Sequence, residues 1–343
     1  MKNVGQLVII LFLFTACGSK EERIQKFLLK GNIASKERNW DQATYYYGEA
    51  IRLEPCFADA WNNLGTVYFQ QKNYEKAMVQ YEKAVSCDPQ FINALLNRAN
   101  TAYELKEYYK AISDLDRAIS LKPDTAIIYF ALGLTYTRLR EFKKSLEAFE
   151  KAAQFAGSDK KQQQELAVNH AIVQYYLKRY DTAKMELQDL ARLNDVEPNI
   201  YNTLSLIETD QGHLKEAMNY INEAIRLAPN QSYYVNNRGY IYLLQNDLAH
   251  AEADINESIS RDPDNAWAYR NKGIFYLARK DFSQAERILT QAWKMDSFVD
   301  RIHYYLGLAY LYNDKRDLAC ASFRKSKDLN DGMVTADLIK QCK

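Results

Sequence analysis

Small and large side chains recur along most of the chain at a fixed interval of 34 residues. Pro55, Pro89 and Pro123 are spaced by 34, and Pro229 and Pro263 repeat the same step. Aligning the chain on these prolines gives nine units, which begin at Ile24, Ala58, Ile92, Ala126, Gln164, Pro198, Ser232, Ala266 and Asp300. A period of this length is typical of a protein built from one repeated supersecondary element.

Three positions of the unit are nearly constant in size. Position 8 is always small and carries Gly31, Gly65, Ala99, Gly133, Ala171, Ser205, Gly239, Gly273 and Gly307. Position 20 is Ala in every unit except the fourth, which has Ser145, and position 24 is always large and apolar or aromatic. Small residues at positions 8 and 20 let two helices cross closely, and bulky residues at positions 4, 11 and 24 are expected to fill the space between hairpins. The proline at position 32 follows the second helix, which it cannot continue.

The array has two irregular places, an insertion before the fifth unit and polar residues at position 11 of the fifth and sixth units, Gln174 and Glu208. Four residues, 160–163, are inserted before the fifth unit, and one helical turn has that length. We therefore expect Ser158 or Asp159 to cap a first helix extended by a turn, and we divide the array into residues 24–159 and 160–333. Residues 334–343 are predicted to form a short capping helix.

The repeated stretch Ala60-Trp61-Asn62-Asn63-Leu64-Gly65 closely resembles the tetratricopeptide repeat. The resemblance covers residues 24–333. It implies an all-α, right-handed superhelical solenoid of antiparallel helix pairs that binds protein or peptide partners on its concave face.

The N-terminus has the pattern of an export signal. A short cationic start precedes the apolar run from Leu7 to Phe14, which is too short to span a bilayer. Thr15-Ala16-Cys17-Gly18 resembles a bacterial lipobox, which implies that residues 1–16 are a cleaved signal peptide and that Cys17 is acylated. An ordinary cleaved signal followed by Cys is the alternative. We predict a lipid-anchored protein of the cell envelope, with the outer membrane as the expected site.

Residues 17–23 are predicted to form a tether between the lipid and the first unit. At ~3.3–3.6 Å per residue, this tether would place the array within ~20–25 Å of the membrane. The charged run Ser19-Lys20-Glu21-Glu22 has two open interpretations. It is similar to the acidic export signal of bacterial surface lipoproteins, and it could equally be the solvated start of the first helix.

The charge balance and the lack of catalytic motifs narrow the range of expected functions. The chain has 45 basic and 44 acidic residues, so nothing suggests a nucleic-acid partner. The four histidines lie in four different units, and the sequence has no metal-ligand cluster, glycine-rich phosphate loop or nucleophile motif. Acidic pairs such as Asp114 and Asp116 are expected to be solvated helix surface. We therefore predict no enzyme activity, no metal and no cofactor.

The four cysteines besides Cys17 show no CxxC pair. Isolated thiols are the preferred interpretation, and Cys320 with Cys342 is the pair most in need of a test.

In the repeats that the chain resembles, positions 2, 5, 6, 9, 12 and 13 of the first helix line the concave face, and asparagine recurs here at position 6. These residues are Asn63, Asn97, Asn169, Asn237 and Asn271. A carboxamide both donates and accepts, which suits the backbone of an extended peptide, so we expect these side chains to be solvated in the free protein. Aromatic and arginine side chains near the asparagines are candidate binding residues, namely Tyr233, Trp267, Arg270, Arg301 and Tyr304. A packing role for both sets is the alternative.

These patterns together predict a membrane-anchored scaffold that holds protein partners in the bacterial cell envelope. The rival function is an adaptor or assembly lipoprotein of the pilot type, serving a secretion, pilus or protease machine. A structural oligomer formed by stacking of array ends is a further alternative.

Overall fold

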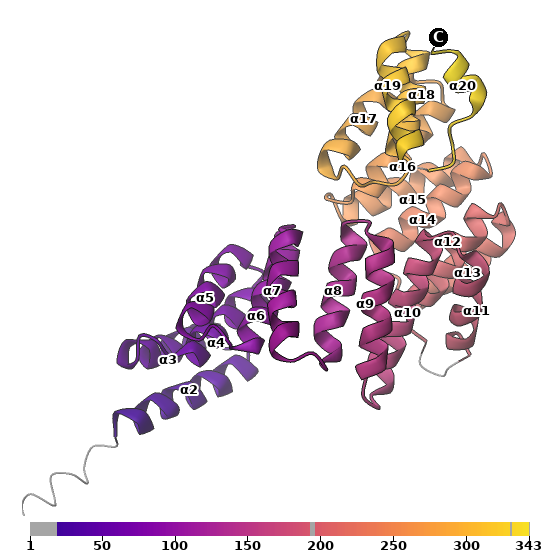
Figure 1. Ribbon diagram of the computed structural model, residues 1–343. Helices are drawn as coiled ribbons and strands as arrows, with labels where there is room; N and C mark the ends of the chain where they lie inside the picture. Colours follow the sequence, from indigo (N-terminus) through magenta and orange to yellow (C-terminus); the bar gives the residue numbers. More distant parts are fainter. Residues whose placement is uncertain (1–18, 193–195, 330, 343) are drawn as a thin grey trace, which may run out of the picture. The chain divides into compact units, whose positions relative to one another are not determined.

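The computed structural model describes residues 19–192, 196–329 and 331–342. The signal-peptide prediction and Cys17 lie outside these residues. Across the described ranges the chain forms 19 helices and no strand. Consecutive helices pair, so that each repeat consists of a first and a second helix (Figure 1).

Helix bounds follow the repeat. The first helices are α2 (Lys20–Lys36), α4 (Ala58–Gln70), α6 (Ile92–Glu104), α8 (Ala126–Arg138), α10 (Lys160–Tyr176), α12 (Pro198–Asp210), α14 (Ser232–Leu244), α16 (Ala266–Ala278) and α18 (Ile302–Tyr312). The second helices are α3 (Trp40–Leu53), α5 (Tyr74–Cys87), α7 (Tyr108–Leu121), α9 (Phe142–Phe155), α11 (Tyr180–Leu190), α13 (Leu214–Leu227), α15 (Leu248–Arg261), α17 (Phe282–Met295) and α19 (Arg316–Asp328). The short α20 (Ala336–Lys340) ends the chain.

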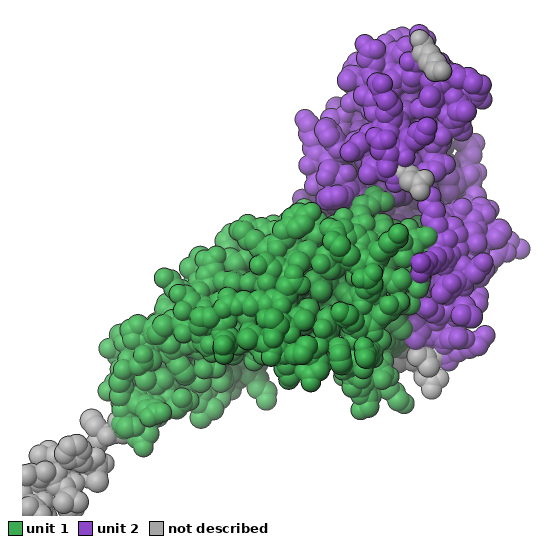
Figure 2. All heavy atoms as spheres, viewed as in Figure 1, with its two compact units in different colours: residues 1–177 green, residues 178–343 purple. Residues whose placement is uncertain are grey.

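The chain divides into two compact units, one ending at Leu177 and the other beginning at Lys178 (Figure 2). The division lies inside the fifth repeat, after α10. Helix α10 belongs to the first unit because it packs against α9 and α8.

Helix α10 has 17 residues, where most first helices have 13. Asp159 caps it, accepting hydrogen bonds from the backbone amides of Lys161 and Gln162. The four inserted residues therefore lengthen the helix by one turn.

Helix α2 begins earlier than the repeat pattern predicts. Ser19 and Glu22 form a capping box, in which each side chain accepts a hydrogen bond from the other residue's backbone amide. The extended tether predicted over residues 17–23 is therefore wrong for its last four residues, which are helical. The charged run begins the first helix.

Position 8 contacts position 24 closely in the six hairpins that have glycine at position 8. A Cβ atom added to Gly65 would lie 2.7 Å from the Tyr81 ring, and one added to Gly133 would lie 2.6 Å from the Phe149 ring. The residue at position 24 is therefore packed against position 8 of its own hairpin. It also fills the space between hairpins, as the sequence predicts, because Tyr47 shares a core with Leu64 and Val67 of the next repeat.

The turn between the two helices of a hairpin places position 15 in the left-handed region. Eight of the nine residues there are not glycine, namely Arg38, Lys72, Lys106, Arg140, Lys178, Asn246, Lys280 and Asp314. The sixth repeat has Gly212, with φ of 81°. Since this conformation costs a residue other than glycine ~1–2 kcal/mol, the packing of the hairpin must impose it.

In two of the hairpins, an ion pair with a buried carboxylate joins the first helix to the second. Arg98 Nε and Nη2 donate to the two carboxylate oxygens of Asp114 at 2.7 and 2.6 Å. Arg238 and Asp254 form the same pair at the same repeat positions. Asp114 is only 8% exposed, so its predicted place on the solvated surface is wrong.

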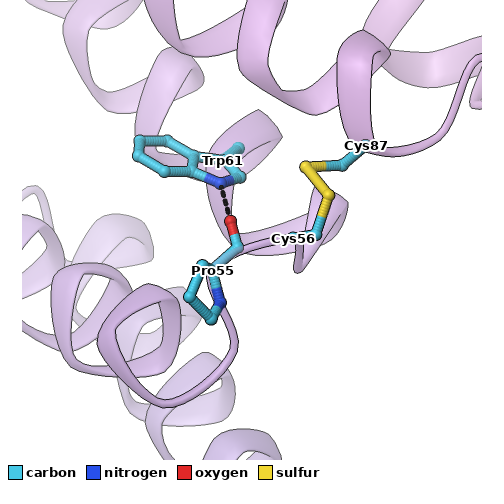
Figure 3. The surroundings of a disulfide bond; sticks show 4 residues. All are labelled: Pro55, Cys56, Trp61 and Cys87. Carbon is cyan, nitrogen blue, oxygen red and sulfur yellow. Dashed lines mark hydrogen bonds between the residues drawn. A yellow bond between two sulfur atoms is a disulfide. The ribbon is translucent and has the colours of Figure 1, made fainter.

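Two disulfide bonds join the four cysteines of the described chain, so the preference for isolated thiols is wrong. Cys56, in the turn before α4, is bonded to Cys87 at the end of α5, with Cα atoms 5.1 Å apart (Figure 3). Successive turns between repeats lie side by side, which brings these residues together. Trp61 Nε1 donates to the Pro55 carbonyl at 2.9 Å and fixes the same turn. Cys320 in α19 is bonded to Cys342 beyond α20.

Two glycine substitutions test the hairpin contact. In Gly65→Ala the new methyl group meets the Tyr81 ring, which is 2% exposed and cannot move without repacking, so the free energy of unfolding should fall by ~1–3 kcal/mol. The control, Gly48→Ala, adds a methyl group in open space on α3 and should raise the free energy by ~0.5–1 kcal/mol. Urea unfolding followed by circular dichroism measures both. Shifts in the same direction would contradict the proposed contact.

Candidate functional site

A chain of asparagine side chains runs along the first helices of the first three repeats. Asn97 Nδ2 donates to Asn62 Oδ1 at 2.9 Å, and Asn62 Nδ2 donates to Asn63 Oδ1 at 3.1 Å. Asn63 Nδ2 in turn donates to Asn32 Oδ1 at 3.0 Å, which also accepts the Tyr47 hydroxyl at 2.8 Å. These hydrogen bonds join α2, α4 and α6, and we call the set the carboxamide ladder.

A hollow of about 400 Å³ lies beside this ladder. Its lining consists of Asn32, Ser35, Lys36, Arg38, Trp40, Tyr47, Asn63, Thr66 and Gln70. Six of these residues stand at positions 6, 9, 12 and 13 of the first two repeats, the positions expected to face a partner. Here, therefore, the predicted binding face is open.

The second compact unit has hydrogen bonds of the same kind between its own first helices, and we include these asparagines in the name carboxamide ladder. Asn237 Nδ2 donates to Asn202 Oδ1 at 2.7 Å, and Asn271 Nδ2 donates to Asn236 Oδ1 at 2.8 Å. Arg270 Nε and Nη2 donate to Asn271 Oδ1 at 3.1 and 2.8 Å.

Side chains from distant repeats meet in the same unit. Arg301 Nη2 lies 2.8 Å from Asp210 Oδ1, although 91 residues separate them. The Tyr180 hydroxyl donates to Asp210 Oδ2 at 3.2 Å, and burial together with that carboxylate raises the pKa of Tyr180 to about 12. The Tyr240 and Tyr305 hydroxyls are 3.2 Å apart.

We call these five residues and Arg270 the cross-repeat cluster. Arg270 is 7% exposed and lies over the Tyr240 ring, 5.1 Å from its centroid. A solenoid residue normally contacts only neighbouring repeats, yet this cluster joins the sixth repeat to the ninth. Arg301 is paired with Asp210, and Arg270 donates to Asn271 Oδ1 and to the Asp300 carbonyl. Both predicted binding residues are therefore already engaged by their own chain.

The other predicted residues are dispersed. Asn169 donates to the backbone carbonyl of Glu165, in its own helix, because position 5 of the preceding repeat holds Phe130, which has no carboxamide. Trp267 is half-buried and packs against the core formed by α16, α17 and α18. Tyr304 packs edge-on against Tyr305. Tyr233 is the most exposed of the predicted aromatic residues, at 39%.

Family models match the repeats directly. Models of the tetratricopeptide repeat match residues 58–91, 126–159, 198–231, 233–265 and 255–287, and a TPR repeat model matches residues 99–139. Together these matches cover more than half of the chain. The chain belongs to the tetratricopeptide-repeat family. Among curated proteins there is no significant match.

Several solved tetratricopeptide-type structures are similar. The pilF protein of Pseudomonas aeruginosa has a TM-score of 0.52 and 22% identity, over 62% of this chain and 95% of that chain. A chain of the APC/C hetero-tetramer Cut9–Hcn1 has a TM-score of 0.61 and 12% identity, over 92% of this chain and 67% of that chain. A tetratricopeptide repeat protein from Parabacteroides merdae has a TM-score of 0.47 and 21% identity, over 84% and 99% of the two chains. At these identities the likeness shows the fold alone.

The asparagines at position 6 differ from the sequence prediction in how far they are exposed to solvent. Asn271 is fully buried, and Asn63, Asn97 and Asn237 are half-buried and hydrogen-bonded to the preceding repeat. The prediction that all of them are solvated is therefore wrong for Asn271. Each ladder asparagine joins adjacent repeats whether or not it also faces a partner.

The sequence argument missed the acceptors of the ladder. Asn62, Asn202 and Asn236 stand at position 5 of a repeat, and each accepts from position 6 of the next repeat, 35 residues later. The pairs could have been found by asking which polar residues recur together at that separation.

A buried carboxylate explains the irregular position 11 of the sixth repeat. Glu208 is 2% exposed and contacts Lys184 Nζ at 2.5 Å and His213 Nδ1 at 2.8 Å. Burial opposes its ionisation, but the hydrogen bonds from Lys184 and His213 outweigh burial and lower the pKa of Glu208. This tetratricopeptide repeat therefore replaces an aromatic contact with a charged one.

Within the described ranges, no group of three or more His, Cys, Asp or Glu residues could hold a metal ion. No described helix combines the length and the apolar character needed to cross a membrane. A hollow of about 720 Å³ beside α17 includes Glu286, Arg287 and Lys315 but none of the predicted binding residues.

Substituting a ladder asparagine tests its structural role. Asn271→Ala removes the acceptor of Arg270 and the donor to Asn236, and all three groups are buried, so the free energy of unfolding should fall by ~1–3 kcal/mol. The matched control is Asn169→Ala, which loses only a bond to its own helix and should change stability by less than ~0.5 kcal/mol. The comparison uses urea unfolding at neutral pH. Equal losses of unfolding free energy in the two variants would show that the hydrogen bonds between repeats do not stabilise the fold.

Proposed function

We propose that this protein is a lipid-anchored scaffold of the bacterial cell envelope, which binds an extended segment of a protein partner on the first helices of its first three repeats. The tetratricopeptide fold supports protein binding in general. The observation that carries the choice of surface is the open polar hollow beside the carboxamide ladder.

Chemistry at the hollow suits a peptide backbone. Asn32, Asn63 and Gln70 offer carboxamide groups, while Ser35 and Thr66 offer hydroxyl groups. Such groups can both donate to and accept from the amides of an extended chain. Asn32 and Gln70 are exposed, whereas Arg270 of the cross-repeat cluster is only 7% exposed, so that cluster is the weaker candidate for the same task.

The envelope assignment draws support from the cysteines. Disulfides persist in oxidising compartments such as the bacterial periplasm and are rare in the cytosol. Two disulfides use four of the five cysteines in the sequence. The fifth is Cys17, which follows the apolar signal-like run, so every cysteine has a role in an exported lipoprotein.

Metabolic labelling tests the anchor. Cells supplied with a labelled palmitate analogue should label the wild-type protein and leave Cys17→Ser unlabelled, with the variant retained at precursor mass. The control Cys320→Ser alters a cysteine far from the signal and should label like the wild type. Label in Cys17→Ser, or none in the wild type, would refute the lipid anchor.

Filling the hollow tests partner binding. Gln70 is exposed and lines the hollow, so Gln70→Trp should weaken capture of the cellular partner at least about tenfold, which corresponds to ~1.4 kcal/mol. The matched control is Gln90→Trp, which places the same side chain on the exposed turn before α6 and should leave capture unchanged. Partner recovery is measured by crosslinking in cells followed by quantitative purification. Equal recovery with both variants would move the binding site away from this hollow.

A further inference from the structure

The outer face of α2 differs from the same face of later first helices in its residue types and in its exposure to solvent. In the second, third and fourth repeats, positions 3 and 10 of the first helix are at most 1% exposed, because the preceding repeat covers them. In the first repeat these positions are Lys26 and Ile33. Lys26 is exposed, and Ile33 is 50% exposed.

Two neighbours complete this surface. Position 7 is the buried Leu64 in the second repeat and the exposed Lys30 in the first. Leu29, one residue earlier, is 59% exposed. We call Lys26, Leu29, Lys30 and Ile33 the α2 end face. It combines two cations with two aliphatic side chains on one side of a helix.

The cations of the end face lack acidic partners. Across the described parts of the chain, neither Lys26 nor Lys30 forms an ion pair, whereas Lys20 pairs with Glu54 at 2.8 Å. Lys30 lies over the Tyr46 ring, 5.3 Å from its centroid, and this leaves its charge uncompensated. Lys36 adds a third exposed cation near the end of the helix.

We propose that the α2 end face docks onto an anionic phospholipid surface. This inference rests on the proposed envelope location. Clustered cations attract anionic headgroups, and exposed aliphatic side chains can enter the boundary between headgroups and acyl chains. Stacking of a second copy is a poorer fit, because it would bury Lys26 at position 3, where the second and third repeats have the fully buried Ala60 and Ala94.

The position of the face in the chain favours this occupant. Helix α2 begins at Lys20, and the part of the sequence that precedes the described residues ends with the lipobox-like segment and Gly18. At ~1.5 Å per residue, the end face lies within ~20 Å of the start of the helix. A membrane that holds Cys17 is therefore within reach of the face, and attachment raises the effective concentration at which weak docking occurs.

Docking would fix the orientation of the array. The hollow of the proposed binding surface includes Asn32 and Lys36 of the same helix. An α2 helix held against the bilayer therefore keeps the hollow close to the membrane, where a membrane-bound partner can reach it.

Vesicle binding tests the inference on the mature chain, Cys17 to Lys343, made without the signal segment and therefore unacylated. The chain should cosediment with vesicles containing phosphatidylglycerol and not with vesicles of phosphatidylcholine alone. Reversing two charges in Lys26→Glu/Lys30→Glu should weaken this binding at least about tenfold, since each Lys near an anionic surface contributes about fivefold. The matched control Lys83→Glu/Lys143→Glu makes the same net change at exposed sites on α5 and α9 and should weaken it much less.

The apolar part has its own pair of variants. Leu29→Ser/Ile33→Ser should weaken vesicle binding several-fold, and Val79→Ser/Tyr109→Ser, at sites 49% and 71% exposed, should not. Circular dichroism establishes that all variants are folded. Equal losses in test and control variants, or no binding to anionic vesicles, would overturn the inference.

The two proposals fail separately. An unlabelled Cys17 together with vesicle binding through α2 would refute the anchor alone. A palmitoylated protein whose unacylated form ignores anionic vesicles would refute docking alone.

Discussion

Contact between a small residue at position 8 and a bulky residue at position 24 is the constraint on which this structure depends. The ring of Tyr81 occupies the place where any side chain on Gly65 would lie, and Phe149 does the same at Gly133. This contact sets how closely the two helices of a hairpin cross. The left-handed turn at position 15 follows from it, because Lys72 or Arg140 adopts an unfavourable backbone conformation that only the packed hairpin can maintain.

Hairpins fixed in this way are joined to one another by polar contacts as well as apolar ones. A carboxamide at position 6 donates to a carboxamide at position 5 of the preceding repeat, which satisfies both groups and sets the register between repeats. In the first unit the ladder borders an open hollow. In the second unit it is continuous with a cluster that joins the sixth repeat to the ninth through Asp210 and Arg301. One repeat pattern therefore gives an accessible surface in the first unit. In the second unit it gives a surface whose polar groups are hydrogen-bonded within the chain.

Much of this architecture could be predicted from the sequence because its cause is local. Period, helix pairing and the small residues all lie within one 34-residue unit, and the one-turn extension of α10 follows from the length of the inserted segment. What escaped prediction depends on contacts between helices. The Cys56–Cys87 bond, the partners of Asn97 and the burial of Asp114 all require knowing which residues of neighbouring helices face each other.

We place partner binding on the open first-helix face of the first three repeats. The corresponding face of the second unit has a structural role. Site-specific photocrosslinking in living cells tests this most directly, with the same photoreactive residue at Gln70 in the hollow and at Tyr233 on α14, the helix that carries Tyr240 of the cross-repeat cluster. The account predicts a discrete crosslinked protein from position 70 and little or none from position 233. A strong crosslink from position 233 with none from position 70 would contradict it.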